Sequence, residues 1–144
     1  MGLERRYFSD LEKCLGFSVK NSKIYQKALT HKSFDKNWNN ERLEFLGDAI
    51  LSSIVSECLF LQFPDQEEGE LSLKRDAIIS RSNLNKIAKR NFQDVLFHYK
   101  TKFISENMYG NFLEAIIGAV YLDKGLGLAK EVVKRLVLTG EEAT

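Results

Sequence analysis

The sequence predicts an all-helical domain, and three observations lead to this fold class. Its 144 residues contain one proline, and proline is the residue that most strongly interrupts a helix. Few stretches alternate apolar and polar residues with the period of two that is typical of strands. Several longer stretches instead repeat apolar residues at the three- and four-residue spacing of a helix. The length suits a single domain with a substantial core.

The expected helices are separated by residues that typically begin or end a helix. Gly16 should end the first helix and Ser22 should cap the second. Asn39 or Asn40 should cap a long central helix, which Pro64 follows. Residues 30–38 lack periodicity and are expected to form a loop. The expected helices, in chain order, are residues 3–15, 22–29, 39–60, 71–80, 80 or 82 to 88, 107–122 and 128–138.

The composition is that of an ordinary soluble globular protein, with 44% hydrophobic and 28% charged residues. No apolar run approaches the ~20 residues that span a bilayer. Cys14 and Cys58 have no CxxC spacing and no histidine cluster nearby, so we expect free thiols in a reducing, cytoplasmic compartment. The net charge of +1 neither favours nor excludes nucleic acid. Acidic residues gather at 41–48 and 65–70 among scattered lysines and arginines, a pattern that fits cation and phosphate binding.

The expected central helix has one acidic face and one apolar face. At about 100° per residue, Glu41, Glu44 and Asp48 lie within roughly 60° of one another. No lysine or arginine lies on this stripe, and like charges four residues apart destabilise a helix by a few tenths of a kcal/mol per pair. A group outside the helix must therefore stabilise the carboxylates, and a divalent cation is the simplest candidate. The opposite face carries Leu43, Leu46, Ile50 and Ile54.

A second helix, expected over residues 107–122, places one acid in apolar surroundings. Apolar residues surround most of its circumference, which predicts a central, buried helix. Glu114 is the only charge in residues 111–122, and Asn111 lies one turn earlier on the same side. Ala115 and Gly118 make this side narrow enough for another helix to approach closely. A lone buried glutamate costs several kcal/mol unless it is paired, protonated or metal-bound. Either a core lysine or arginine pairs with Glu114, or its face meets the acidic stripe around a shared cation.

These segments together resemble the signature of the ribonuclease III family. The run ERLEFLGDAIL at residues 41–51 carries the strongest likeness. ALTHKS at 28–33 precedes it, EEGELS at 67–72 follows it, and LEAIIGAVYLDKG at 113–125 completes the set in the family's order and rough spacing. The resemblance covers residues 11–138, and the acidic connection before EGELS is similar to that of the bacterial endonuclease.

The resemblance implies an all-helical endonuclease domain over residues 1–144 that forms a symmetric homodimer and holds double-stranded RNA in an acidic valley. It implies a hydrolase that uses Mg²⁺, with Mn²⁺ as a substitute, and leaves a 5′-phosphate and a 3′-hydroxyl. The implied role is processing of ribosomal and messenger RNA precursors. The matching positions are Glu44, Asp48 and Glu114 for the metal-binding and catalytic acids, Glu41 and Glu68 for the secondary acids of the valley, and Phe45 for an aromatic that inserts into the partner subunit.

Asn111 departs from the family pattern, which has an aspartate at this position. The amide keeps one carbonyl oxygen that can bind a metal or orient a coordinated water, but it lacks the negative charge. Three interpretations follow. Asn111 is a neutral ligand in a working site, or it was introduced in place of an aspartate to trap substrate, or the chain is a natural, inactive RNA-binding relative.

Two other functional classes use the same residues. One is a non-catalytic protein that binds duplex RNA, and the other is a helical metallohydrolase acting on a small molecule. The EGELS segment and the clustered lysines favour a long polyanionic substrate. His31 is a conceivable base, but the ALTHKS segment is expected instead to brace the loop before the acidic helix. Without the double-stranded-RNA-binding domain that usually follows in bacterial members, we expect weak and salt-dependent RNA binding.

Overall fold

The computed structural model describes residues 2–20 and 22–139, and these residues form helices joined by loops. No strand is present in the described residues, and Thr30 and His98 form an isolated bridge. The all-helical prediction is therefore confirmed. The helices are α1 (Gly2–Leu15), α2 (Ser22–Ala28), α3 (Glu41–Gln62), α4 (Glu68–Ile79), α5 (Arg81–Asn91), α6 (Glu106–Lys124) and α7 (Leu126–Leu136).

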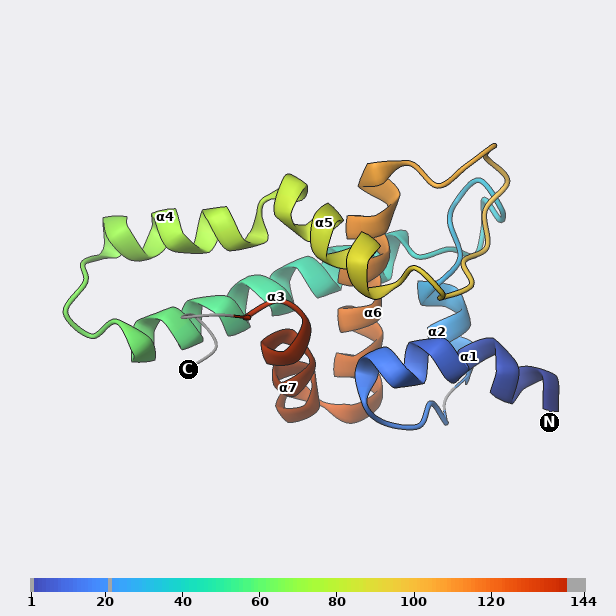
Figure 1. The fold of residues 1–144 in the computed structure, drawn as a ribbon, viewed down its shortest axis with the longest axis horizontal. Coiled ribbons are helices and arrows are strands. Elements are labelled where there is room, and N and C mark those ends of the chain that lie inside the picture. The colour runs from blue at the N-terminus through green and yellow to red at the C-terminus, as the bar shows by residue number, and fades with distance from the viewer. Residues whose placement is uncertain (1, 21, 140–144) are drawn as a thin grey trace.

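Helix α6 is the centre of the fold (Figure 1). Its residues from Phe112 to Val120 are all buried, as expected for a helix that is apolar on every side. α3, α5, α7 and α2 pack around it, and α3 forms the most extensive contact. The C-terminal half of α3 extends beyond this bundle and pairs with α4 to form an arm (Figure 1).

Glycines at the α3–α6 crossing let the two backbones approach closely. A Cβ atom on Gly47 of α3 would overlap the carbonyl oxygen of Glu114. A Cβ atom on Gly118 of α6 would lie 2.5 Å from the carbonyl oxygen of Leu43. The narrow face expected around Gly118 thus meets the central helix, and Gly47 is its counterpart on the other side.

Several helix ends differ from the expected ones. α4 begins at Glu68, three residues earlier than expected, because acids in a first turn interact favourably with the positive end of the helix. Ser80 caps α5, with its hydroxyl accepting the N–H of Asn83 at 3.2 Å. Asn40 occupies the N-cap position of α3, but its side chain is directed to the carbonyl of Ala28. α7 covers Leu126–Leu136 and not 128–138.

The ALTHKS segment braces the loop before α3, as expected. The N–H of Asn40 donates to the carbonyl of Thr30 at 2.9 Å. The N–H of His31 donates to the carbonyl of His98 at 2.8 Å, and the N–H of His98 donates to that of Leu29 at 2.9 Å. These bonds hold the loop between α2 and the segment before α6. The start of α3, and with it the acidic stripe, is fixed by this arrangement.

Candidate active site

The acidic stripe of α3 faces α6 at the crossing of the two helices. Glu44 is half-buried, whereas Glu41 and Asp48 are exposed. Burial raises the pKa of Glu44, and the negative charges of Glu41 and Asp48 raise it further, against the opposing effect of Arg81 and Lys32. The stripe is therefore a crowded group of carboxyls at the edge of the core.

Glu114 on α6 joins this group. It is 3% exposed, and the carboxyl of Asp48 lies near enough to influence its ionisation. Burial, followed by the influence of Asp48, raises the pKa of Glu114 to about 8, and Glu44 adds to the effect. Arg81 favours the ionised form but is outweighed. The structure thus brings Glu44, Asp48 and Glu114 together, and the surroundings of Glu114 favour its protonated form.

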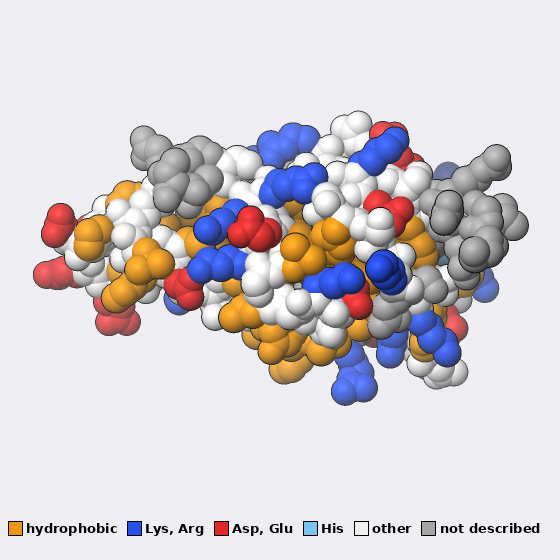
Figure 2. All heavy atoms as spheres, turned by 90° about the horizontal axis from the view of Figure 1, so that it is seen from below, with side chains coloured by type: hydrophobic (Ala, Val, Ile, Leu, Met, Phe, Trp, Pro, Cys, Tyr) orange, Lys and Arg blue, Asp and Glu red, His pale blue; other side chains and the backbone are white. Residues whose placement is uncertain are grey.

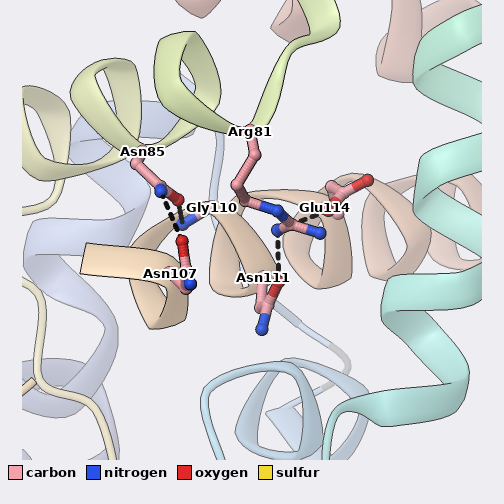
Figure 3. Close-up of polar contacts among 6 residues, drawn as sticks. All are labelled: Arg81, Asn85, Asn107, Gly110, Asn111 and Glu114. Carbon is pink, nitrogen blue, oxygen red and sulfur yellow. Dashed lines mark hydrogen bonds and ion pairs between the residues drawn. The ribbon is translucent and has the colours of Figure 1, made fainter. Parts of the chain in front are cut away.

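Arg81, the first residue of α5, also lies at this site and was not identified from the sequence. Its Nη1 donates to Oε1 of Glu114 at 3.3 Å and to Oδ1 of Asn111 (Figure 3). Two alternatives were predicted for Glu114: a basic partner, or a face that meets the acidic stripe around a shared cation. Arg81 is such a basic partner, and the face of Glu114 also meets the acidic stripe, while the shared cation stays a prediction. A cation in the first turn of a helix opposes the positive end of its dipole. The position of Arg81 directly after the Ser80 cap was therefore a signal that an acidic partner lies nearby.

Asn85 holds α5 against α6 one turn beyond Arg81. Its Oδ1 accepts the N–H of Gly110 at 3.0 Å, and its Nδ2 donates to Oδ1 of Asn107 at 3.0 Å (Figure 3). A Cβ atom on Gly110 would collide with the Asn85 side chain. This clamp fixes the first turn of α5, so Arg81 is carried over Asn111 and Glu114.

Glu68 and Phe45, which the family resemblance singled out, are not part of this acidic cluster within one chain, and neither is Lys74. Glu68 is exposed at the start of α4, on the arm, and it contributes nothing to the pKa shifts of Glu44 and Glu114. Phe45 is 81% exposed on α3. Lys74 lies over the ring of Phe63, with its Nζ 4.4 Å from the ring centre.

The donors at the site suit a hard divalent cation in kind. Carboxylate and amide oxygens are the ligands that Mg²⁺ prefers, and Glu44, Asp48, Glu114 and Asn111 supply them. Asp48 and Glu44 both raise the pKa of Glu114, which places the three carboxyls in one neighbourhood. In the described parts of the chain, however, no three histidine, cysteine, aspartate or glutamate side chains already stand in a metal-binding arrangement. Arg81 contacts two of the four donors.

The fold and the acidic site together define a helical nuclease-type domain, and comparisons with known proteins agree. Two structures of the ribonuclease III nuclease domain from Campylobacter jejuni superpose with TM-scores of 0.82 and 0.80, at 38% and 37% sequence identity. They cover 90% of this chain and 95% and 92% of those domains. One of them is described for flexibility in the region involved in its dimer formation.

Sequence comparisons extend this assignment. A family profile described as Ribonuclease-III-like matches residues 21–140. Ribonuclease 3 of Bacteroides fragilis is 41% identical over 143 residues, covering 94% of this chain and 49% of the relative. Ribonuclease 3 of Aliarcobacter butzleri is 40% identical over 136 residues, covering 90% and 61%. The chain belongs to the ribonuclease III family.

The chain spans about half to three-fifths of the length of these relatives. It corresponds to almost the whole of the Campylobacter jejuni nuclease domain. Among the described residues, no helix is long and apolar enough to cross a membrane.

Proposed function

We propose that this domain cleaves double-stranded RNA by metal-dependent hydrolysis of phosphodiester bonds, leaving a 5′-phosphate and a 3′-hydroxyl. Its setting would be the processing of ribosomal and messenger RNA precursors in the cytoplasm. The observation that carries the proposal is the crowding of Glu114 against Asp48 and Glu44, in a chain of the ribonuclease III family. The fold brings these carboxyls together at a cost in free energy from charge repulsion. A bound cation would offset this cost.

Mg²⁺, or Mn²⁺ in its place, would be held by Glu44, Asp48 and Glu114, with Asn111 as a neutral ligand. Such an ion, when bound, supplies a water of lowered pKa and neutralises the charge on the departing oxygen. Because the pKa of Glu114 is raised, any proton on this carboxyl must leave before the carboxylate binds a cation. Asp48 favours the protonated form of Glu114 in the metal-free protein, and half-buried Glu44 lies one turn earlier on α3.

A homodimer would complete the site with acids from a second copy. In one copy, Glu68 lies on the arm away from Glu44 and Glu114, and Phe45 is almost fully exposed. The arm also carries exposed Phe60 and Leu73, and Figure 2 shows apolar side chains beside acidic ones at that end of the molecule. An exposed apolar surface of this kind favours association.

The arm also offers a place for the Phe45 ring of a partner. A pocket of about 480 Å³ between α3 and α4 is lined partly by Leu59, Phe60 and Leu71, with Glu68 at its edge. A two-fold interface requires both the inserted side chain and its pocket on the same chain, and this chain has both. Insertion of Phe45 would bring Glu68 of one copy toward the acidic site of the other.

An impaired, RNA-binding protein is the second candidate, and one contact favours it. Arg81 is paired with Glu114, and Asn111 adds no negative charge. Such a protein would retain duplex RNA without cutting it. The intact carboxyls at 41, 44, 48, 68 and 114 favour the enzyme.

A gel assay on end-labelled duplex RNA, with Mg²⁺ or with a chelator, separates these functions. We expect cleavage by the unchanged protein only with Mg²⁺, and loss of cleavage in Glu114→Gln. Glu131→Gln, which removes an exposed carboxylate on α7, is the matched control and should cut normally. Retention of RNA without cleavage under both conditions would support the RNA-binding candidate. Neither cleavage nor retention would contradict both.

A further inference from the structure

We infer that Arg81 is a tethered cation that occupies part of the divalent-metal site, so that metal binding requires this side chain to leave Glu114 and Asn111. The inference rests on the proposed metal site. Arg81 would then compete with the metal ion for Glu114 and Asn111, and this competition would set how tightly the site binds metal.

The side-chain oxygens of Glu114 and Asn111 both accept from one nitrogen of Arg81. Glu114 and Asn111 lie three residues apart on α6, where their side chains share one face. Nη1 of Arg81 donates to both side-chain oxygens, Oε1 of Glu114 and Oδ1 of Asn111. The point on which the two oxygens converge therefore already holds a positive charge. A metal ion that used the same two oxygens would need that place.

The backbone of Arg81 is held in place, whereas its side chain is half exposed. The side chain is 48% exposed although it contacts a carboxyl that is 4% exposed. The Ser80 cap and the Asn85 clamp hold the first turn of α5 without using the guanidinium. Release of the guanidinium would therefore break only its own contacts.

A pocket beside Arg81 has room for its released side chain. Arg81 lines a pocket of about 420 Å³ between α5 and α6, and the other lining residues include Glu106 and the two lysines Lys86 and Lys89. The carboxylate of Glu106 offers a second acceptor there. The side chain can thus turn along α5 without entering the core.

The guanidinium of Arg81 and a divalent metal ion carry charge of the same sign. Because residue 111 is an amide, the two α6 donors that Arg81 contacts carry at most one negative charge, and the guanidinium cancels it. A divalent ion competing for these donors faces repulsion from Arg81 until that side chain leaves. Removal of the Arg81 charge should therefore tighten metal binding.

Titration of the RNA-free protein with Mn²⁺, followed by electron paramagnetic resonance of the free ion, tests the inference. We expect Arg81→Gln to lower the Mn²⁺ dissociation constant about tenfold, which corresponds to about 1.4 kcal/mol. Arg81→Lys keeps the charge and should bind Mn²⁺ within about twofold of the unchanged protein, on the same scale. Lys86→Gln is the matched control, because Lys86 lines the same pocket without contacting Glu114, and its dissociation constant should stay near that of the unchanged protein.

Each other outcome has one meaning. Equal or weaker Mn²⁺ binding by Arg81→Gln, when the unchanged protein binds, contradicts the inference and leaves the metal site standing. Equal tightening by Lys86→Gln would mean a general field effect and also contradicts it. If no variant binds Mn²⁺, both the inference and the proposed metal site are wrong.

A second measurement avoids any loss of folding in the variants. In the unchanged protein, a Mg²⁺ titration followed by NMR of the Arg81 side-chain nitrogens should move their resonances toward those of a solvent-exposed arginine. Resonances that do not respond while Mg²⁺ binds would overturn the inference.

Discussion

Glu114 is the buried carboxyl at the centre of this site, and its raised pKa links folding to pH. A carboxyl that is buried at a helix crossing, beside two further carboxyls, favours its protonated form. In the unfolded chain the same group returns to the ordinary pKa of 4.5. Between these values the folded protein holds a proton that the unfolded chain has lost, so folding is linked to pH.

This linkage gives a prediction for the metal-free protein. Its stability contribution from Glu114 is complete below pH 4.5 and declines as the pH rises through about 8. Glu114→Gln cannot titrate, so its stability relative to the unchanged protein should rise by about 1.4 kcal/mol per pH unit across this window. Urea unfolding in a chelating buffer at several pH values measures the difference. Parallel stability curves for the two proteins would show that Glu114 is already ionised.

Asn111 gives a second prediction at this scale. Asn111→Asp restores a negative charge beside Glu114, and ligand charge raises affinity for hard cations. We expect the Mg²⁺ concentration for half-maximal cleavage to fall about three- to tenfold, a gain that the pairing of the new carboxylate with Arg81 limits. Cleavage of duplex RNA by both proteins, titrated with Mg²⁺ and Mn²⁺, is the measurement. If the unchanged protein cuts with neither ion and the aspartate variant cuts, the interpretation of Asn111 as a ligand in a working site is wrong.

The residue scale is also where prediction from sequence was least complete. Helical periodicity placed Glu44 and Asp48 on one stripe, and the apolar run around Glu114 predicted its burial. Arg81 was not predicted because its contact depends on the angle at which α5 meets α6. Two residues set that angle, Asn85 and Gly110, and neither follows a recognisable sequence pattern.

At the scale of helices, the α3–α6 crossing determines the site, since it brings the acids of the two helices together. Gly47 lies on α3 one residue before Asp48, and its missing side chain permits the contact with the Glu114 carbonyl. The sequence predicted the narrow side of α6 from Gly118 and Ala115. The close approach of α3 at Gly47 was not predicted, because a helical glycine alone does not identify what it contacts.

Gly47→Ala should therefore destabilise the fold and separate the acids. An added methyl group in tight packing costs about 1–3 kcal/mol, which should lower the melting temperature by several degrees. Gly127→Ala is the control, since a Cβ there meets nothing within 4 Å and alanine favours a helix by about 1 kcal/mol over glycine. Thermal unfolding by circular dichroism measures both. An unchanged melting temperature in Gly47→Ala would mean that the helices have room to spare.

Helix existence was predicted better than helix ends. Periodicity and capping residues predicted each helix, and the apolar faces of α2, α3, α5 and α7 pack on α6. Several ends differ by two or three residues, because capping depends on which side chain reaches which backbone group. Asn40 illustrates this: it is at the N-cap, but its amide is directed to Ala28, and Asn39 accepts the N–H of Glu41 instead.

At the scale of the whole molecule, the fold leaves an arm whose exposed surface suggests a partner. Neither the direction of the arm nor its pocket follows from the sequence, which predicts α3 and α4 but not their pairing. The resemblance to the ribonuclease III family supplied the expectation of a dimer, with Phe45 and Glu68 at the contact.

Phe45→Asp should disrupt this dimer. We expect the unchanged protein to sediment at about twice its 16.5 kDa chain mass and the variant to sediment as a single chain, because an ionised side chain is costly in an apolar pocket. Phe103→Asp is the control, since Phe103 is also exposed but lies in the loop before α6. Sedimentation velocity separates the forms. A single-chain unchanged protein, or a dimeric Phe45→Asp, would contradict the proposed interface.

Crystals grown with Mn²⁺, with diffraction measured at the manganese absorption edge, test directly whether Glu44, Asp48 and Glu114 hold a metal ion. We expect an anomalous peak bound by Asp48 and Glu114, with Glu44 beside it and Arg81 turned away from the two α6 donors. Crystals that contain Mn²⁺ elsewhere, with Arg81 still seated on Glu114 and no peak among the three acids, would contradict the claim that these carboxyls are gathered to hold a metal ion.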